Sequence, residues 1–218
     1  MRRSFFRFSI PGLTLAALLL IAVRGEGAQY PAYNTVAVDV PFDGGAFASY
    51  SRMWRMGRYV DAGFFAGAGD VENHFQLQRP DGSNVDARTQ TVVAPFIGPK
   101  LSFNFPFVAI SLGYGFFWAK TDLSVDWPGQ ATLRGTTSGW GQGIYSPLLV
   151  LDFLDQKHNV FWGVGIGGLF ATRYPDLEAS NDNLKISTDQ KPLDNLTFHV
   201  HLLWSGISRP ARASNGDF

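Results

Sequence analysis

The sequence contains no cysteine, which excludes disulfide bonds, thiolate metal sites and cysteine nucleophiles. Its formal net charge is zero, so no excess of basic residues indicates a nucleic-acid partner. Charged residues make up only 17% of the chain, whereas aromatic residues reach 15% and glycine occurs 24 times. This composition is more typical of a β-rich protein that faces an apolar medium than of a soluble enzyme.

Apolar runs long enough for a membrane helix are also absent. The longest run of the later chain, "PLLVLDFL" at 147–154, is short and is interrupted by Asp152. The N-terminus carries a basic stretch, "MRRSFFR", then an apolar stretch at 13–23 that is too short for a typical spanning helix, then small residues. We therefore predict a signal peptide over residues 1–27 and export of the chain, rather than an uncleaved membrane anchor.

What the mature chain contains is a series of strand-like blocks separated by turn-forming residues. Helical periodicity is hard to find, whereas alternation with a period of two recurs along the chain. The blocks are bounded by clusters rich in glycine, proline, aspartate and asparagine. We predict eight strands, at 35–42, 46–54, 59–75, 89–105, 107–121, 139–153, 160–174 and 196–207.

The clearest alternation lies in "FVAISLGYGFFWAK", residues 107–120. Bulky apolar residues take one face of this strand, while the other face carries alanine, serine and glycine, with Phe117 as the only large exception. A soluble strand usually sets a polar face against water, and neither face here is polar. Bulky groups facing lipid and small groups facing a narrow interior would explain both faces. The residues predicted to face lipid are Val108, Ile110, Leu112, Tyr114, Phe116 and Trp118, with Trp162, Phe198 and Trp204 in later strands.

The connections alternate between tight turns and longer polar loops, with the short "DGG" turn after the first strand as an exception. An even number of strands with short turns at one end and long loops at the other is typical of transmembrane β-barrels. Over residues 35–207 the sequence resembles the small eight-stranded outer-membrane proteins of Gram-negative bacteria, in its pattern rather than in a signature motif.

This resemblance implies an all-β fold, an eight-stranded antiparallel up-and-down transmembrane β-barrel in the cell outer membrane. It also implies that the short turns face the periplasm and that the long loops lie outside the cell. Residues 28–34 would form a short lead and residues 208–218 a polar tail. The rival interpretation is a soluble periplasmic β-barrel binding protein, in which the apolar faces would form the core.

Three features depart from the barrel pattern. Pro95 and Pro99 lie within one predicted strand, where each removes a hydrogen-bond donor from the ladder. Arg52 occupies an outward position of the second strand. The final residue, Phe218, follows the polar tail, whereas the last strand of the related barrels usually ends in an aromatic residue itself.

Alternation also places charged residues on the inward faces. The predicted polar network of the lumen consists of Asp39, Asp61, Lys100, Arg173, His199 and His201. Buried charges need partners, so such a network could plug the barrel. The alternative is a narrow polar path for small solutes.

His199 and His201 lie two residues apart on one strand face, a spacing that can chelate a metal ion. No cysteine or clustered carboxylate adjoins them, so we expect hydrogen-bonded histidines, no metal and no cofactor. An enzyme that modifies lipid A would need a serine activated by a histidine. Ser205 lies four residues from His201, about 13 Å along an extended strand, which is too far for direct activation.

The function expected from the sequence is a structural or surface-interaction role in the outer membrane, or restricted passage of small solutes. The expected partner is outer-membrane lipid, and a surface ligand would be contacted through the loops at 76–88 and 175–195. A lipid A-modifying enzyme is the alternative from another class.

Overall fold

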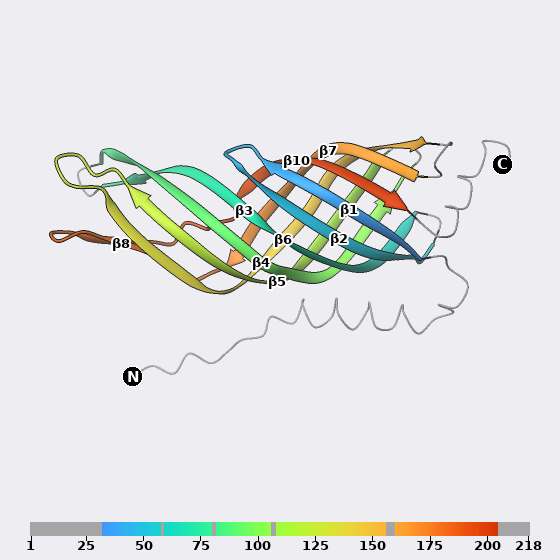
Figure 1. Ribbon diagram of the computed structural model, residues 1–218, viewed down its shortest axis with the longest axis horizontal. Helices are drawn as coiled ribbons and strands as arrows, with labels where there is room; N and C mark the ends of the chain where they lie inside the picture. Colours follow the sequence, from blue (N-terminus) through green and yellow to red (C-terminus); the bar gives the residue numbers. More distant parts are fainter. Residues whose placement is uncertain (1–31, 58, 80–81, 106–107, 156–159, 205–218) are drawn as a thin grey trace.

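The computed structural model describes residues 32–57, 59–79, 82–105, 108–155 and 160–204 (Figure 1). The predicted signal peptide, most of the lead and the polar tail lie outside these residues. Among the described residues no helix is long and apolar enough to cross a bilayer. The strands are β1 Ala32–Pro41, β2 Gly45–Arg55, β3 Val60–Gln78, β4 Asn84–Asn104, β5 Val108–Val125, β6 Leu133–Asp155, β7 Val160–Arg173, β8 Leu177–Ser180, β9 Lys185–Thr188 and β10 Asn195–Trp204.

Eight of these strands close into a ring. Each of β1 to β6 pairs with the next strand along the chain in antiparallel register. β10 pairs with both β7 and β1, and its pairing with β1, in which His199 stands opposite Asp39, closes the barrel. The remaining strands, β8 and β9, form a hairpin that joins β6 at one residue pair, Arg134 with Ser180. The predicted eight-stranded antiparallel barrel is therefore confirmed.

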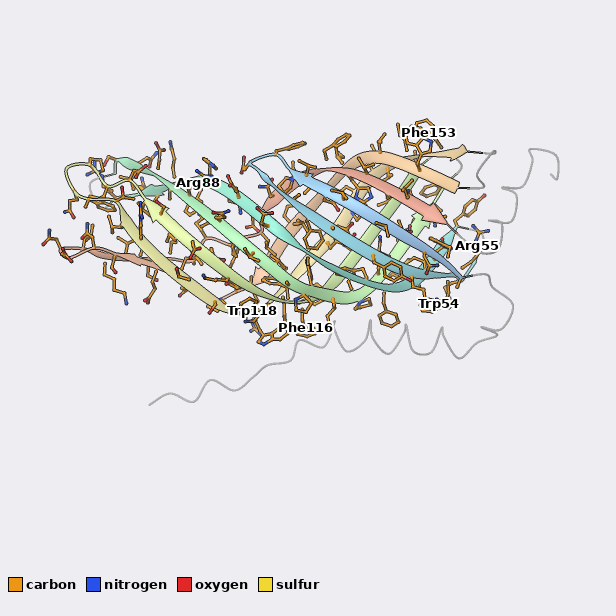
Figure 2. All side chains as sticks on the ribbon, viewed as in Figure 1. Trp54, Arg55, Arg88, Phe116, Trp118 and Phe153 are labelled. Carbon is orange, nitrogen blue, oxygen red and sulfur yellow. The ribbon has the colours of Figure 1, made fainter. Side chains whose placement is uncertain are left out.

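The two faces of β5 are those that the sequence predicts. Leu112 is 49% exposed on the outer surface, whereas Phe117 is fully buried in the interior. Figure 2 shows Phe116 and Trp118 outside the ribbon of the barrel. The apolar faces form the outer surface rather than a core, which rules out the soluble-barrel interpretation. Five of the other predicted lipid-facing residues are exposed: Ile110, Tyr114, Phe116, Trp162 and Phe198. Val108 and Trp118 are half-buried, and the side chain of Trp204 lies outside the part of the chain that the structure describes.

The strands differ greatly in length. β3, β4, β5 and β6 have 18 to 23 residues, whereas β1, β2 and β10 have 10 or 11. Figure 1 shows the four long strands continuing past the others at the end of the barrel opposite the described termini. We call this the loop end, and the opposite end the termini end. The projecting parts of the four strands, with the β8–β9 hairpin, are called the extension.

The structure corrects three boundaries predicted from the sequence, two of them in the extension. Most of the expected loop at 76–88 belongs to β3 and β4, which leaves only residues 79–83 as the connection. The expected loop at 175–195 contains the β8–β9 hairpin, and β1 begins at Ala32 rather than at residue 35. The errors at 76–88 have one cause: polar residues alternate there with apolar ones, as in a soluble strand with one wet face.

The interior of the extension is apolar and continuous with the lumen. Val85 and Ala87 of β4, Leu123 of β5 and Leu133 of β6 are buried in the same cluster as the aromatic residues of the barrel. Leu177 of the hairpin is fully buried against this cluster. The hairpin therefore covers the inner face of the long strands, and the extension has a packed core of its own.

Two of the departures from the barrel pattern have local explanations. Pro95 lies in a β-bulge between Val93 and Phe96, where the register with β5 shifts, and bulges tolerate a missing donor. The outward Arg52 places its guanidinium 5.8 Å from the ring centroid of Trp54, a cation–π contact at the termini end, where Figure 2 places Trp54.

The assignment of faces can be tested with three variants of β5. Leu112→Arg should lower the free energy of unfolding by about 2–4 kcal/mol, the usual midplane cost of a cation. Leu112→Ala should cost less, because lipid fills the space that the side chain leaves. Gly113→Leu should destabilise by overpacking, since a Cβ there would lie 2.7 Å from Phe65 Cε1. Refolding titrations into lipid vesicles measure all three, and a harmless Gly113→Leu beside a severe Leu112→Ala would contradict the assignment.

Candidate functional site

A polar layer inside the barrel is centred on Asp39 of β1, which is fully buried. The Thr197 hydroxyl donates to Asp39 Oδ1 at 3.0 Å, and His199 Nδ1 lies 2.9 Å from the same oxygen. The Tyr145 hydroxyl donates to Asp39 Oδ2 at 2.9 Å. The carboxylate therefore has partners on β6 and β10, which offset the cost of removing its charge from water.

Tyr145 links this carboxylate to the buried cation of the lumen. Its hydroxyl also lies 2.8 Å from Ser49 Oγ. Lys100 Nζ lies 5.4 Å from the centroid of the Tyr145 ring and donates to Ser51 Oγ at 3.3 Å. Lys100 is only 6% exposed, so its charge is stabilised by the ring, the serine and the nearby Asp39.

The two histidines of β10 bond to each other instead of converging on one point. His199 Nε2 lies 3.1 Å from His201 Nδ1, and the rings meet edge to face with centroids 5.3 Å apart. Within the described ranges no group of three or more histidines and carboxylates could hold a metal ion. The pair extends the hydrogen-bond network of Asp39 along the inner face of β10.

Asp61 belongs to a second cluster near the termini end. Its Oδ2 accepts hydrogen bonds from the Tyr33 hydroxyl and from Asn104 Nδ2, both at 2.6 Å. Arg55 Nε lies 3.7 Å from Asp61 Oδ1, and Figure 2 shows Arg55 at that end of the barrel. The described partners of Asp61 thus differ from those of Asp39, which are Thr197, His199 and Tyr145.

Arg173 is the predicted lumen residue that the structure places outside. The register of β7 against β6 passes from Ala171 opposite Gly143 to Arg173 opposite Gln142, which leaves Thr172 as an extra residue in a β-bulge. The bulge reverses the alternation, so Ala171 is buried whereas Arg173 is exposed. Strict alternation predicted the opposite face because a bulge cannot be read from the period.

A small cavity separates the two polar clusters. It has a volume of about 30 Å³ and is lined by Lys100, Ser102, Ser111 and His201 among others, which gives room for about one or two water molecules. Toward the loop end the lumen is filled by aromatic rings. Their centroids lie 5.6 Å apart for Phe47 and Tyr145, 5.1 Å for Phe65 and Phe96, and 5.4 Å for Phe96 and Phe117.

The sequence analysis missed Tyr145, the residue that joins Asp39, Ser49 and Lys100. The sequence pattern could have identified it, because Tyr145 lies two and four residues after Gly143 and Gly141 on the same inward face of β6. Tyr33 and Asn104, the partners of Asp61, were missed as well. Their importance depends on a meeting of β1, β3 and β4 that no short segment shows.

No protein-family model and no curated protein matches the sequence. Among solved structures, the chain is similar to the N-terminal β-barrel domain of Pseudomonas aeruginosa OprF, with 8% identity, a TM-score of 0.35 and coverage of 81% of this chain and 99% of that one. It is similar to Acinetobacter baumannii CarO2 with 12% identity, a TM-score of 0.42 and coverage of 81% and 99%.

A third similar structure is Neisserial surface protein A, with 13% identity, a TM-score of 0.33 and coverage of 80% of this chain and 94% of that one. At these identities and TM-scores the similar structures carry no argument, and the assignment rests on the chain's own geometry. The ring of eight strands and the apolar outer surface give the chain the architecture of a small outer-membrane β-barrel, as the sequence predicts.

The importance of the Asp39 cluster can be measured by substitution. Asp39→Ala should lower the free energy of unfolding by about 3–5 kcal/mol, because it leaves buried partners without their anion. Asp70→Ala, at the half-buried rim of β3, is the matched control and should change it by less than about 0.5 kcal/mol. Urea unfolding in vesicles gives both values, and equal effects would show that the cluster does not stabilise the barrel.

Proposed function

We propose that the protein is a closed outer-membrane barrel that carries a rigid β-platform, the extension, on the outside of the cell for surface interactions. The packing of the lumen is the observation that carries this proposal. Phe47, Phe96, Phe117 and Tyr145 come from four different strands, and all are fully buried. Their contacts span the interior of the ring, which leaves no room for a water-filled path.

Several contacts hold the extension together. The Asn181 side chain in the β8–β9 turn donates to the Ala131 carbonyl of the β5–β6 connection at 3.0 Å. At the base of the hairpin the Tyr174 hydroxyl donates to the Ala119 carbonyl at 2.9 Å, and burial raises the pKa of Tyr174. Hydrogen bonds and a packed core of this kind support a platform of fixed shape rather than a set of mobile loops.

The outer face of the extension supports contact with water and with polar partners. Arg88 and Glu72 form an ion pair at 2.6 Å on β4 and β3, and Figure 2 places Arg88 well beyond the lipid-facing Phe116. The Thr136 hydroxyl donates to Asp122 on the same face. A polar outer face above an apolar belt is the distribution expected of a barrel that projects beyond the membrane.

A lipid A-modifying enzyme and a path for small solutes through the lumen have less support. The His199–His201 pair faces the lumen between the aromatic rings and the termini end, whereas acyl chains lie against the outer surface. A solute would have to displace Phe96 and Tyr145 from a closely packed cluster, which costs several kcal/mol.

Conductance tests the closed lumen. The purified protein in a planar bilayer should form no stable open channel, because aromatic side chains fill the interior. Far-UV circular dichroism of the same preparation is the control for folding. A steady single-channel current from the folded protein would overturn the closed barrel and favour the passage of small solutes.

Cysteine labelling tests the orientation, and the absence of native cysteine makes each label unique. Asp182→Cys in the β8–β9 hairpin should react with a membrane-impermeant maleimide on intact cells. Gly57→Cys at the termini end, where a Cβ would meet no atom within 4 Å, should react only after lysis. The reverse pattern would place the extension in the periplasm and would contradict a surface role.

A further inference from the structure

The apolar outer surface ends in two cations on neighbouring strands at the loop end. On the outer face of β5, Lys120 directly follows Trp118, and on β7 the exposed Arg173 follows the half-buried Phe170. Trp140 on β6 lies between them, opposite Trp118 in the register, and is 63% exposed. Each cation is thus the first charged residue beyond the belt, where lipid headgroups begin.

Lys120 and Arg173 have no direct ion-pair partner in the described part of the chain. No described carboxylate lies within 4.0 Å of either cation, and neither side chain makes a hydrogen bond to a described residue. Two other cations of the extension are paired at close range, Arg88 with Glu72 at 2.6 Å and Lys185 with Glu178 at 2.8 Å. The two rim cations are therefore available to contact an anion directly.

Carboxylates also lie near this part of the rim. Asp122 follows Lys120 on the outer face of β5, where it accepts a hydrogen bond from the Thr136 hydroxyl. Asp194 Oδ1 accepts a hydrogen bond from the backbone N–H of Ala171, two residues before Arg173. Each of these carboxylates therefore has a donor other than the two cations.

We propose that the surface formed by Lys120, Trp140 and Arg173 binds the phosphate groups of a phosphorylated glycolipid of the outer leaflet. Lys120 stands opposite Ser138 and Arg173 opposite Gln142, so the backbones of the two cations are offset by about 13 Å along β6 and by about 10 Å across it. This separation suits a headgroup with two phosphates better than a single ion. The guanidinium offers a bidentate contact to phosphate, and the exposed indole between the cations packs against the sugar or the first methylene groups.

The bulge at Thr172 acquires a function in this proposal. Without it, Arg173 would continue the alternation of Ala171 and point into the lumen. With it, the guanidinium reaches the outer rim. The proposal rests on the orientation proposed above, because only that orientation brings this rim into the outer leaflet.

Binding is measured with the full mature chain in detergent, by native mass spectrometry during titration with an acylated disaccharide that carries two phosphates. Lys120→Gln and Arg173→Gln should each weaken binding about fivefold, and the double variant roughly 30-fold, as expected for one interfacial cation each. Arg134→Gln is the matched control, since Arg134 is an exposed cation further along β6, and it should bind like the unchanged chain. The dephosphorylated glycolipid should bind the unchanged chain as weakly as the phosphorylated one binds the double variant.

Unchanged affinity of the double variant would overturn the proposal, and so would an equal loss in Arg134→Gln, which would indicate general electrostatic attraction. Full competition by millimolar inorganic phosphate would indicate a site for a soluble anion instead of a lipid. Because this titration does not depend on the sidedness of the membrane, a failure of binding is distinct from a failure of the orientation. A reversed labelling pattern together with intact binding would leave the rim as an anion site but would exclude an outer-leaflet ligand.

Discussion

The small circumference of the eight-stranded ring is the constraint on which the rest of the structure depends. A ring of this size leaves an interior only wide enough for side chains, so each inward residue must fit its neighbours on the opposite wall. Glycine at position 113 leaves the space that the Phe65 ring occupies. Large rings on some strands therefore occupy the space that glycines leave on the neighbouring and facing strands.

The same constraint explains the chemistry of the lumen. A carboxylate that enters so narrow a space loses its water and must be satisfied by the facing strands. Asp39 therefore holds Thr197, His199 and Tyr145 around it. Asp61 of β3 likewise accepts hydrogen bonds from Tyr33 of β1 and Asn104 of β4. The inward charges act as fixed parts of the packing, which is the reason that we relate function to the surfaces outside the lumen.

The long strands β3 to β6 run from the apolar belt of the barrel into the extension, whose outer face is polar. Within β5, the outward side chains change from Leu112 and Phe116 to Lys120 and Asp122, while the inward side chains remain small or apolar from Ala119 to Val125. The backbone ladder with β6 is continuous through this change, and the ladder with β4 resumes beyond the bulge at Pro95. A single set of strands therefore provides both the belt against lipid and the wall of the platform, and the rim where the two meet has a chemistry of its own.

The sequence by itself determined the eight strands of the ring, most of their faces and the class of fold, because alternation with a period of two is a local property of the chain. Leu112 and Gly113 were assigned to the correct faces for this reason, as were Asp39, Lys100 and His199. Only the tertiary structure decided which inward residues meet, since the register between strands brings Tyr145 to Asp39 over more than 100 positions of sequence. It also decided the exceptions: a single extra residue at Thr172 turns Arg173 outward, and a local pattern has no means to show a bulge that exists only relative to the neighbouring strand.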